Sequence, residues 1–199
     1  MITYVIINVQ GVKKCGMARK ETITKTDILN AAFEMTMEAG FDHVTARTLA
    51  AKAGCSTQPI FRVYKNMEEL GAELFERVVA HFDEYYDKFP KNSDTPFVNL
   101  GFAYVKFAQD YPKLFKLLFD SENKYGKSLY DILNGKGSVV KEVNNARFSG
   151  CSNPSVMFMK MWIFIHGAAC MSLTGDYDLN DEETVTLLEE SYQAFQKTL

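Results

Sequence analysis

The stretch that decides the fold is residues 45–70, which read TARTLAAKAGCSTQPIFRVYKNMEEL. Thr45 is a favourable N-cap for a short helix, and Gly54 ends that helix at a position where a left-handed backbone costs least. Ser56 is the expected N-cap of a second short helix, and Pro59 falls in its first turn, where a missing N–H is tolerated. Two short helices joined through a glycine turn meet the geometric needs of a helix-turn-helix, whose second helix enters the major groove of DNA.

The second short helix has one polar face and one apolar face. We expect Thr57, Gln58 and Arg62 to face outward, where they are available to a partner. Ile60 would pack inward as the main core residue of the helix. This division is what a DNA-reading helix requires.

A longer helix precedes the pair. Thr24 is its expected N-cap, and Asp27 three residues later completes a capping box. Apolar residues recur at helical spacing between positions 28 and 39, and Gly40 ends the helix. The three helices together form the expected DNA-binding domain, over residues 21–66.

The rest of the chain also reads as helix, so the predicted fold class is all-α. Residues 67–199 form the second expected domain. A long amphipathic helix starts after Asn66 and runs towards Tyr86, and residues 88–96 read as a linker. Further helices are expected near residues 96–110, 112–120, 124–133, 138–147, 154–174 and 181–197.

Residues 1–20 form an expected N-terminal extension, either disordered or an artefact of an extended start, because Met17 begins a stretch typical of a chain start. A strand over Ile2–Val9 is the alternative. No secretory signal is recognised, since Lys13 and Lys14 follow the apolar stretch rather than precede it.

Composition favours a folded cytoplasmic protein with a basic head. Hydrophobic residues make up 47% of the 199 residues, and no apolar run approaches the roughly 18 residues that cross a bilayer, so no membrane partner is expected. The net charge of −3 divides into +4 over residues 1–66 and −7 over the remainder, which suggests a nucleic-acid-binding module on an acidic body. The four cysteines form no metal-binding pair, so we expect reduced thiols, with Cys55 and Cys170 acting as small hydrophobes.

The sequence gives no reason to expect an enzyme. It lacks the glycine-rich nucleotide motifs, the serine nucleophile motif and the HExxH zinc motif. Its three histidines, at positions 43, 81 and 166, have no metal-ligand spacing. No cofactor and no metal are therefore expected.

The residues quoted above resemble the N-terminal module of TetR-family transcriptional regulators. That pattern has Ala-Gly-Val-Ser, then Leu-Tyr-x-Tyr/His-Phe, then Lys-Asn-Lys-Glu-Glu-Leu, and residues 24–72 follow it closely. Two positions depart from it: Phe61 stands where a tyrosine usually reaches a phosphate, and Met67 replaces a common lysine. The amides at the start of the helix after Asn66 would still bind a phosphate there.

The resemblance implies which residues contact DNA. Arg47 would reach a base or phosphate, Lys65 a phosphate, and Phe61 a thymine methyl, while Gln58 and Arg62 would read adenine and guanine. The full set of expected DNA contacts is Thr45, Arg47, Ser56, Thr57, Gln58, Phe61, Arg62, Tyr64 and Lys65. The alternative for each is an ordinary solvated or helix-start residue.

Two further sites are expected in the body. Dimerisation is needed because one module contacts only a few base pairs, and the resemblance places the interface on the last two helices. The expected interface residues are Gly167, Ala168, Met171, Val185, Leu188, Tyr192 and Phe195. Packing within the same subunit is the alternative. The expected contacts to a small apolar or amphipathic effector are Phe107, Tyr111, Phe115, Tyr130, Met161, Trp162 and His166, with plain core packing as the alternative.

The sequence therefore predicts a homodimeric repressor that binds a palindromic double-stranded operator and leaves it when an effector binds. The second hypothesis is an architectural or division-linked DNA-binding protein of the same fold with no small-molecule effector.

Overall fold

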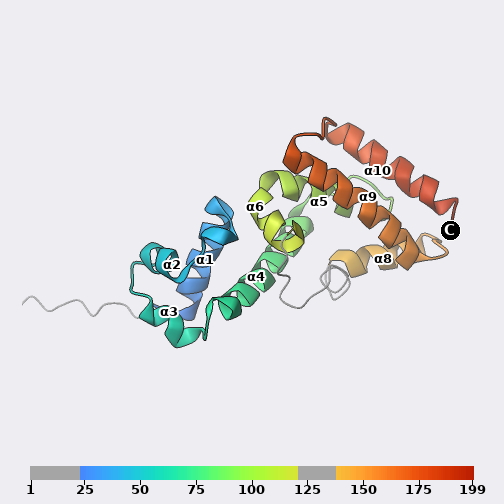
Figure 1. Cartoon of the computed structure of the whole chain (residues 1–199). Helices are drawn as coiled ribbons and strands as arrows, with labels where there is room; N and C mark the ends of the chain where they lie inside the picture. The colour runs from blue at the N-terminus through green and yellow to red at the C-terminus, as the bar shows by residue number, and fades with distance from the viewer. Residues whose placement is uncertain (1–22, 121–137) are drawn as a thin grey trace, which may run out of the picture.

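The computed structural model describes residues 23–120 and 138–199, and every regular element in them is helical (Figure 1). The elements are α1 (Lys25–Ala39), η1 (Phe41–His43), α2 (Ala46–Lys52), α3 (Gln58–Val63), α4 (Met67–Lys88), α5 (Val98–Asp110), α6 (Pro112–Phe115), η2 (Lys116–Asp120), α8 (Ser138–Phe148), α9 (Pro154–Thr174) and α10 (Asp181–Gln196). The all-α prediction is confirmed. The expectations for residues 1–20 and for a helix over 124–133 lie outside the described residues.

Helices α1–α3 form the head of the molecule. Thr24 caps α1 as expected: its hydroxyl accepts from the Asp27 N–H (3.1 Å), and the Asp27 carboxylate accepts from the Thr24 N–H (2.9 Å). Thr45 caps α2 in the same way with Thr48 as its partner. Gly54 then turns the chain with φ of 66°.

One local prediction in the head is wrong. The N-cap of α3 is Thr57 rather than Ser56, and Thr57 makes no side-chain capping bond. The backbone of Thr57 is already in the right-handed helical region, with φ of −70° and ψ of −19°. A side-chain cap needs an extended backbone at the capping residue, so no serine or threonine signal could have located this helix start.

Helix α4 joins the head to the body, which comprises α5–α10. On the head side, Glu73 pairs with Lys25 (2.6 Å), and Arg77 bonds Asn30 of α1. On the body side, α4 packs against α5 and α8. Figure 1 shows α4 as one continuous helix running between the two parts. The loop over residues 89–97 therefore lies within the body, between α4 and α5.

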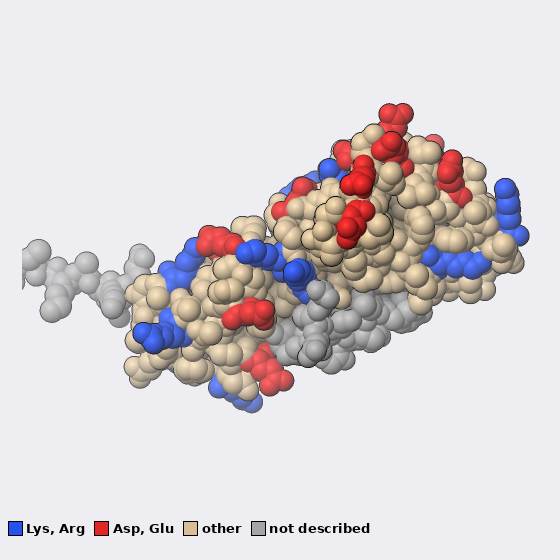
Figure 2. Space-filling view, turned by 45° about the horizontal axis from the view of Figure 1, so that its top comes forward, with Lys and Arg blue, Asp and Glu red and all other residues tan. Residues whose placement is uncertain are grey.

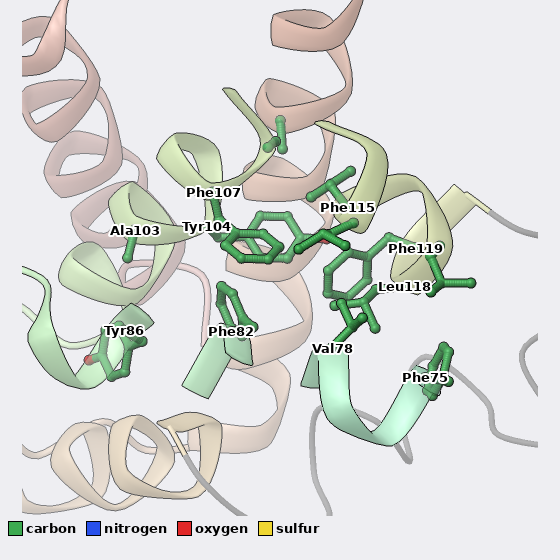
Figure 3. Packing of buried hydrophobic residues seen from close by; sticks show 14 of the residues in the cluster. Phe75, Val78, Phe82, Tyr86, Ala103, Tyr104, Phe107, Phe115, Leu118 and Phe119 are labelled. Carbon is green, nitrogen blue, oxygen red and sulfur yellow. The ribbon is translucent and has the colours of Figure 1, made fainter. Parts of the chain in front are cut away.

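The body core is formed mainly by α4, α5, α6 and α9. Figure 3 shows the aromatic side chains of α4 and α5 meeting those of α6 and η2. Gly101 on α5 permits a close approach to α9, because a Cβ there would lie 2.6 Å from Cδ1 of Ile165. A larger residue at position 101 would force the side chain of Ile165 to shift.

The turn between α4 and α5 depends on a buried carboxylate. Phe97 has a left-handed backbone with φ of 66°, which is costly for a residue other than glycine. Glu142 of α8 accepts a hydrogen bond from the Phe97 N–H (2.7 Å) and another from the Tyr86 hydroxyl (2.8 Å). The side chain that stabilises this turn thus comes from a helix far along the chain.

Helix α9 is more apolar than we expected from the sequence, in which no apolar run approached the length that crosses a bilayer. By length and composition it is the one helix of the described residues that could cross a membrane, and 33% of its most apolar window is buried inside the protein. It packs against α5, α8 and α10 in the body.

Replacing Glu142 with alanine should lower the free energy of unfolding by about 1–3 kcal/mol, because two buried donors lose their acceptor. Urea denaturation monitored by circular dichroism measures this. Glu190→Ala, on the exposed face of α10, is the matched control and should change stability by no more than about 0.5 kcal/mol. Equal effects from the two substitutions would contradict the anchoring role of Glu142.

Tyr64 and Phe61 should behave in opposite ways, since Tyr64 is 1% exposed and Phe61 is 49% exposed. Tyr64→Ala should cost about 3–5 kcal/mol of stability, as for other buried aromatic side chains. Phe61→Ala should leave the free energy of unfolding nearly unchanged. Thermal denaturation of both variants tests the assignment, and a strongly destabilised Phe61→Ala protein would show it to be wrong.

Candidate nucleic-acid interface

The residues expected to contact DNA lie at one end of the molecule, on α2, α3 and the turns beside them (Figure 1). Eight of the nine are exposed: Thr45, Arg47, Ser56, Thr57, Gln58, Phe61, Arg62 and Lys65. Ile60 is 0% exposed and fixes α3 against the head core, as expected. The structure thus brings these side chains together on an accessible surface.

Tyr64 is the exception, and its assignment as a DNA contact is corrected. Its ring is buried at the end of α3, with the Lys25 ammonium 5.1 Å from the ring centroid. Burial raises the pKa of Tyr64, and the nearby Glu73 carboxylate raises it further. Tyr64 is therefore a neutral core residue that holds α3 in place rather than a contact to phosphate.

Two of the exposed residues also make contacts within the protein. The Thr45 hydroxyl accepts from the Thr48 N–H (3.2 Å), so it serves first as a helix cap. The Arg62 guanidinium donates to the carbonyl of Ile23 at 3.5 Å, which is a long contact. Because that bond is weak and Arg62 is exposed, the guanidinium remains available to a base edge.

The cations of the head differ in whether a carboxylate neutralises them. Lys52 pairs with Glu38 (3.1 Å) and Glu34 (3.6 Å), and its bond to Glu38 raises the pKa of Lys52. Within residues 23–120 and 138–199, no carboxylate pairs with Arg47 or Lys65. Figure 2 shows Lys and Arg side chains at several points over the head, whereas Asp and Glu predominate on the visible face of the body.

The start of α4 suits a phosphate less well than expected. The Asn66 side chain already accepts from the Glu69 N–H (2.9 Å), and the Glu69 carboxylate accepts from the Lys65 N–H (2.7 Å). Glu68 adds a second carboxylate to the first turn. Asn66 thus satisfies one of the helix-start amides, and the carboxylates of Glu68 and Glu69 offset the positive field that would attract an anion.

The residues proposed to hold an effector fall into two separate clusters. Phe107 and Tyr111 pack around His81 of α4, at ring-centroid distances of 6.2 and 5.1 Å. Phe115, Trp162 and His166 pack together with Tyr104. Phe107, Phe115 and Met161 are 0% exposed and act as core residues, and Tyr130 lies outside the described part of the chain.

Among these candidates, Met161 and Trp162 do border an open space. It is an apolar crevice of about 10 Å³ between α5 and α9, and its other lining residues include Phe97, Leu100 and Phe158. That volume has room for about one water molecule. An effector would have to widen this crevice or use a space bordered by other parts of the chain.

Some of the residues expected at the dimer interface are buried within the subunit, and others are exposed. Leu188 is 2% exposed, Tyr192 is 4% exposed and Ala168 is 8% exposed, so these three pack within their own subunit, and the expectation is corrected for them. Val185 and Phe195 are half-buried against the same core. Gly167 and Met171 remain exposed on α9.

Three exposed apolar residues of α9 were not among the interface residues expected from the sequence. Val156 is 41% exposed, Met159 43% and Ile163 68%. With Gly167 and Met171 they continue one face of the helix at spacings of three, four, four and four residues. We call this set of five residues the α9 stripe. The spacing was visible in the sequence, but the helix is apolar all round, so periodicity could not separate its exposed face from its buried one.

The fold of this chain is similar to that of several bacterial proteins of solved structure. A TetR-like transcriptional regulator from Rhodococcus sp. RHA1 superposes with a TM-score of 0.62 and 17% identity, over 86% of this chain and 94% of that one. The fatty acid degradation regulator FadR from Bacillus halodurans gives a TM-score of 0.54 and 13% identity, over 88% and 100% of the chains. At these identities the likeness shows the fold alone. No curated protein matches the sequence.

The sequence match falls on the head. Residues 28–74 fit the family model described as bacterial regulatory proteins, tetR family. This range includes α2, the glycine turn, α3 and the exposed side chains around them. Over residues 28–74 the chain is therefore similar to the DNA-binding part of TetR-family transcriptional regulators.

Proposed function

We propose that the protein is a cytoplasmic, homodimeric repressor that binds a palindromic operator and leaves it when a small apolar or amphipathic effector binds the body. The observation that carries the proposal is the exposed face of α3, with Gln58 and Arg62 on it and the unpaired cations Arg47 and Lys65 beside it. Base-reading side chains flanked by phosphate-binding cations are what operator recognition needs. We assign the chain no catalytic activity.

The α9 stripe supports the dimer. The side chains of Val156, Met159, Ile163 and Met171 are exposed to solvent along one face of α9. Gly167 lies on the same face, between Ile163 and Met171. Beside Gly167 the space where a Cβ would lie is open, with nothing within 4 Å, so a second helix can approach closely there. A contiguous apolar face on a soluble protein marks an interaction site, and a second copy of α9 would cover it without any membrane.

Contacts between the head and the body support release by an effector. The Lys113 ammonium of α6 donates to the carbonyl of Glu38 at the end of α1 (2.9 Å). The His81 ring lies between Phe33 of α1 (5.3 Å) and Tyr111 (5.1 Å), and burial lowers the pKa of His81, so the ring is neutral at neutral pH. A shift of α6 would therefore move α1, and with it the DNA-reading surface.

The alternative is an architectural or division-linked DNA-binding protein of the same fold. The small size of the α5–α9 crevice favours this second candidate, since the described residues enclose no space for an effector there. Titrating the operator complex with a panel of apolar and amphipathic compounds separates the two. Release by any compound supports the repressor, and unchanged binding throughout supports the alternative.

The double substitution of Gln58 and Arg62 by alanine should abolish preference for the selected operator over random DNA while leaving the oligomer intact. Each bidentate base contact discriminates by about 1–3 kcal/mol. Operator selection from a random library, followed by affinity measurements at fixed salt, checks this. Lys52→Ala is the matched control in the same head, because Glu34 and Glu38 already neutralise Lys52. Unaltered operator affinity in the double variant would show that α3 does not read the sequence.

Ile163→Glu should convert the dimer into a monomer, because it places a charge at the most exposed point of the α9 stripe. Sedimentation equilibrium measures the mass, and Gln193→Glu on the exposed face of α10 is the matched control. A dimeric Ile163→Glu protein would place the interface elsewhere. A monomeric unsubstituted protein would remove the dimer from the proposal altogether.

A further inference from the structure

Three side chains of the body form a hydrogen-bonded chain that ends on a thiol. The Tyr104 hydroxyl of α5 lies 3.0 Å from Nδ1 of His166, and Nε2 of the same imidazole lies 3.5 Å from Sγ of Cys170. His166 and Cys170 are one helical turn apart on α9, so their side chains share a face. A thiol with a base at this distance, and a third group orienting the base, is the arrangement of an activated nucleophile.

Two aromatic rings hold the imidazole of His166 in place. The imidazole lies nearly parallel to the Trp162 ring, with centroids 5.6 Å apart and planes 20° apart. The Phe115 ring is also nearly parallel to it, at 6.1 Å and 20°. This packing keeps the imidazole in the orientation that places Nε2 beside the thiol of Cys170.

Tyr104 contacts the nitrogen of His166 that faces away from the thiol. The phenol is 1% exposed, and burial raises the pKa of Tyr104 well above its usual value, so it stays neutral. When Nδ1–H donates to the phenol oxygen, Nε2 is left as an acceptor towards the thiol. In that tautomer Tyr104 is the positioning residue and His166 is the base.

We propose that Cys170 is a reactive thiol that forms covalent adducts with small α,β-unsaturated carbonyl compounds. This revises the expectation that Cys170 is only a small hydrophobe. The aromatic and apolar side chains around His166 suit a planar conjugated carbonyl better than a strongly hydrated reagent. The proposal is independent of DNA binding, because it concerns bond formation at one sulfur.

The step balances without a further reactant. The thiol proton moves to Nε2 of His166, which leaves a thiolate beside an imidazolium. The sulfur lone pair forms a bond to the β-carbon of the electrophile, and the C=C π pair moves onto the α-carbon and carbonyl as an enolate. The imidazolium then returns the proton to the α-carbon, so the net result is addition of S–H across C=C.

The other described thiols serve as internal references. Cys55 is half-buried, as Cys170 is, and lies in the turn before α3, whereas Cys151 is 6% exposed after α8. Within the part of the chain that the structure describes, neither of them bonds a histidine. Cys55 therefore reports the reactivity of a thiol of similar exposure without a base.

The test is the rate at which N-ethylmaleimide modifies each cysteine of the full chain in its native oligomer, read by peptide mass spectrometry. At pH 7 we expect Cys170 to react about tenfold faster than Cys55, because the paired thiol is largely ionised. Its rate should also exceed that of Cys170 in urea-unfolded protein. Cys170→Ser should remove the fast adduct, and Cys55→Ser should leave it.

Two variants distinguish the base from plain packing. In His166→Gln the rate at Cys170 should fall to that of Cys55 and should rise about tenfold per pH unit below pH 8, as for an unassisted thiol. Tyr104→Phe keeps the ring and should give an intermediate rate. A native Cys170 that reacts no faster than Cys55, or an unchanged rate in His166→Gln, overturns the proposal. Should His166→Gln fail to fold, the comparison of native with urea-unfolded Cys170 still decides it.

Discussion

Helix α4 packs against the head and the body at once, and the arrangement of every other element depends on it. Glu73 and Arg77 hold α1 on one part of its length, and Tyr86 meets α8 on another. Because 22 residues form one uninterrupted helix, the two parts cannot move independently at this point. The α3 surface proposed to read DNA is therefore positioned by contacts made in the body as well as by those in the head.

Much of the fold could be predicted because its signals are local. The helix caps at Thr24 and Thr45 need only residues three apart, and both are present. Helix α9 begins at Pro154 and ends before Gly175, as its sequence indicates, since proline favours a first turn and glycine a left-handed end. The exposed face of α3 followed from the inward position of Ile60. Each of these features is decided within one or two helical turns.

The errors concern which surface an apolar residue faces, and this depends on packing partners rather than on spacing. Leu188 and Tyr192 form a regular stripe that suits a partner subunit and an internal core equally well, and in the structure it lies in the core. Tyr64 could have been placed correctly, because it lies four residues after the buried Ile60 and shares its face. The contacts that join Cys170 to His166 and Tyr104 could not have been found from the sequence, since the Tyr104–His166 bond joins positions 62 residues apart along the chain.

The anchor on the 89–97 turn also bears on how the chain folds. Glu142 lies 45 residues beyond Phe97, so the left-handed turn gains its stabilising bond only after α8 has docked. Closing a segment of that length costs conformational entropy, and the hydrogen bond from Phe97 to Glu142 offsets this cost only once it has formed. On the ribosome the N-terminal part of the chain emerges first. The turn between α4 and α5 therefore lacks its bond to Glu142 until α8 has been synthesised. The turn is thus completed only when this carboxylate arrives with α8.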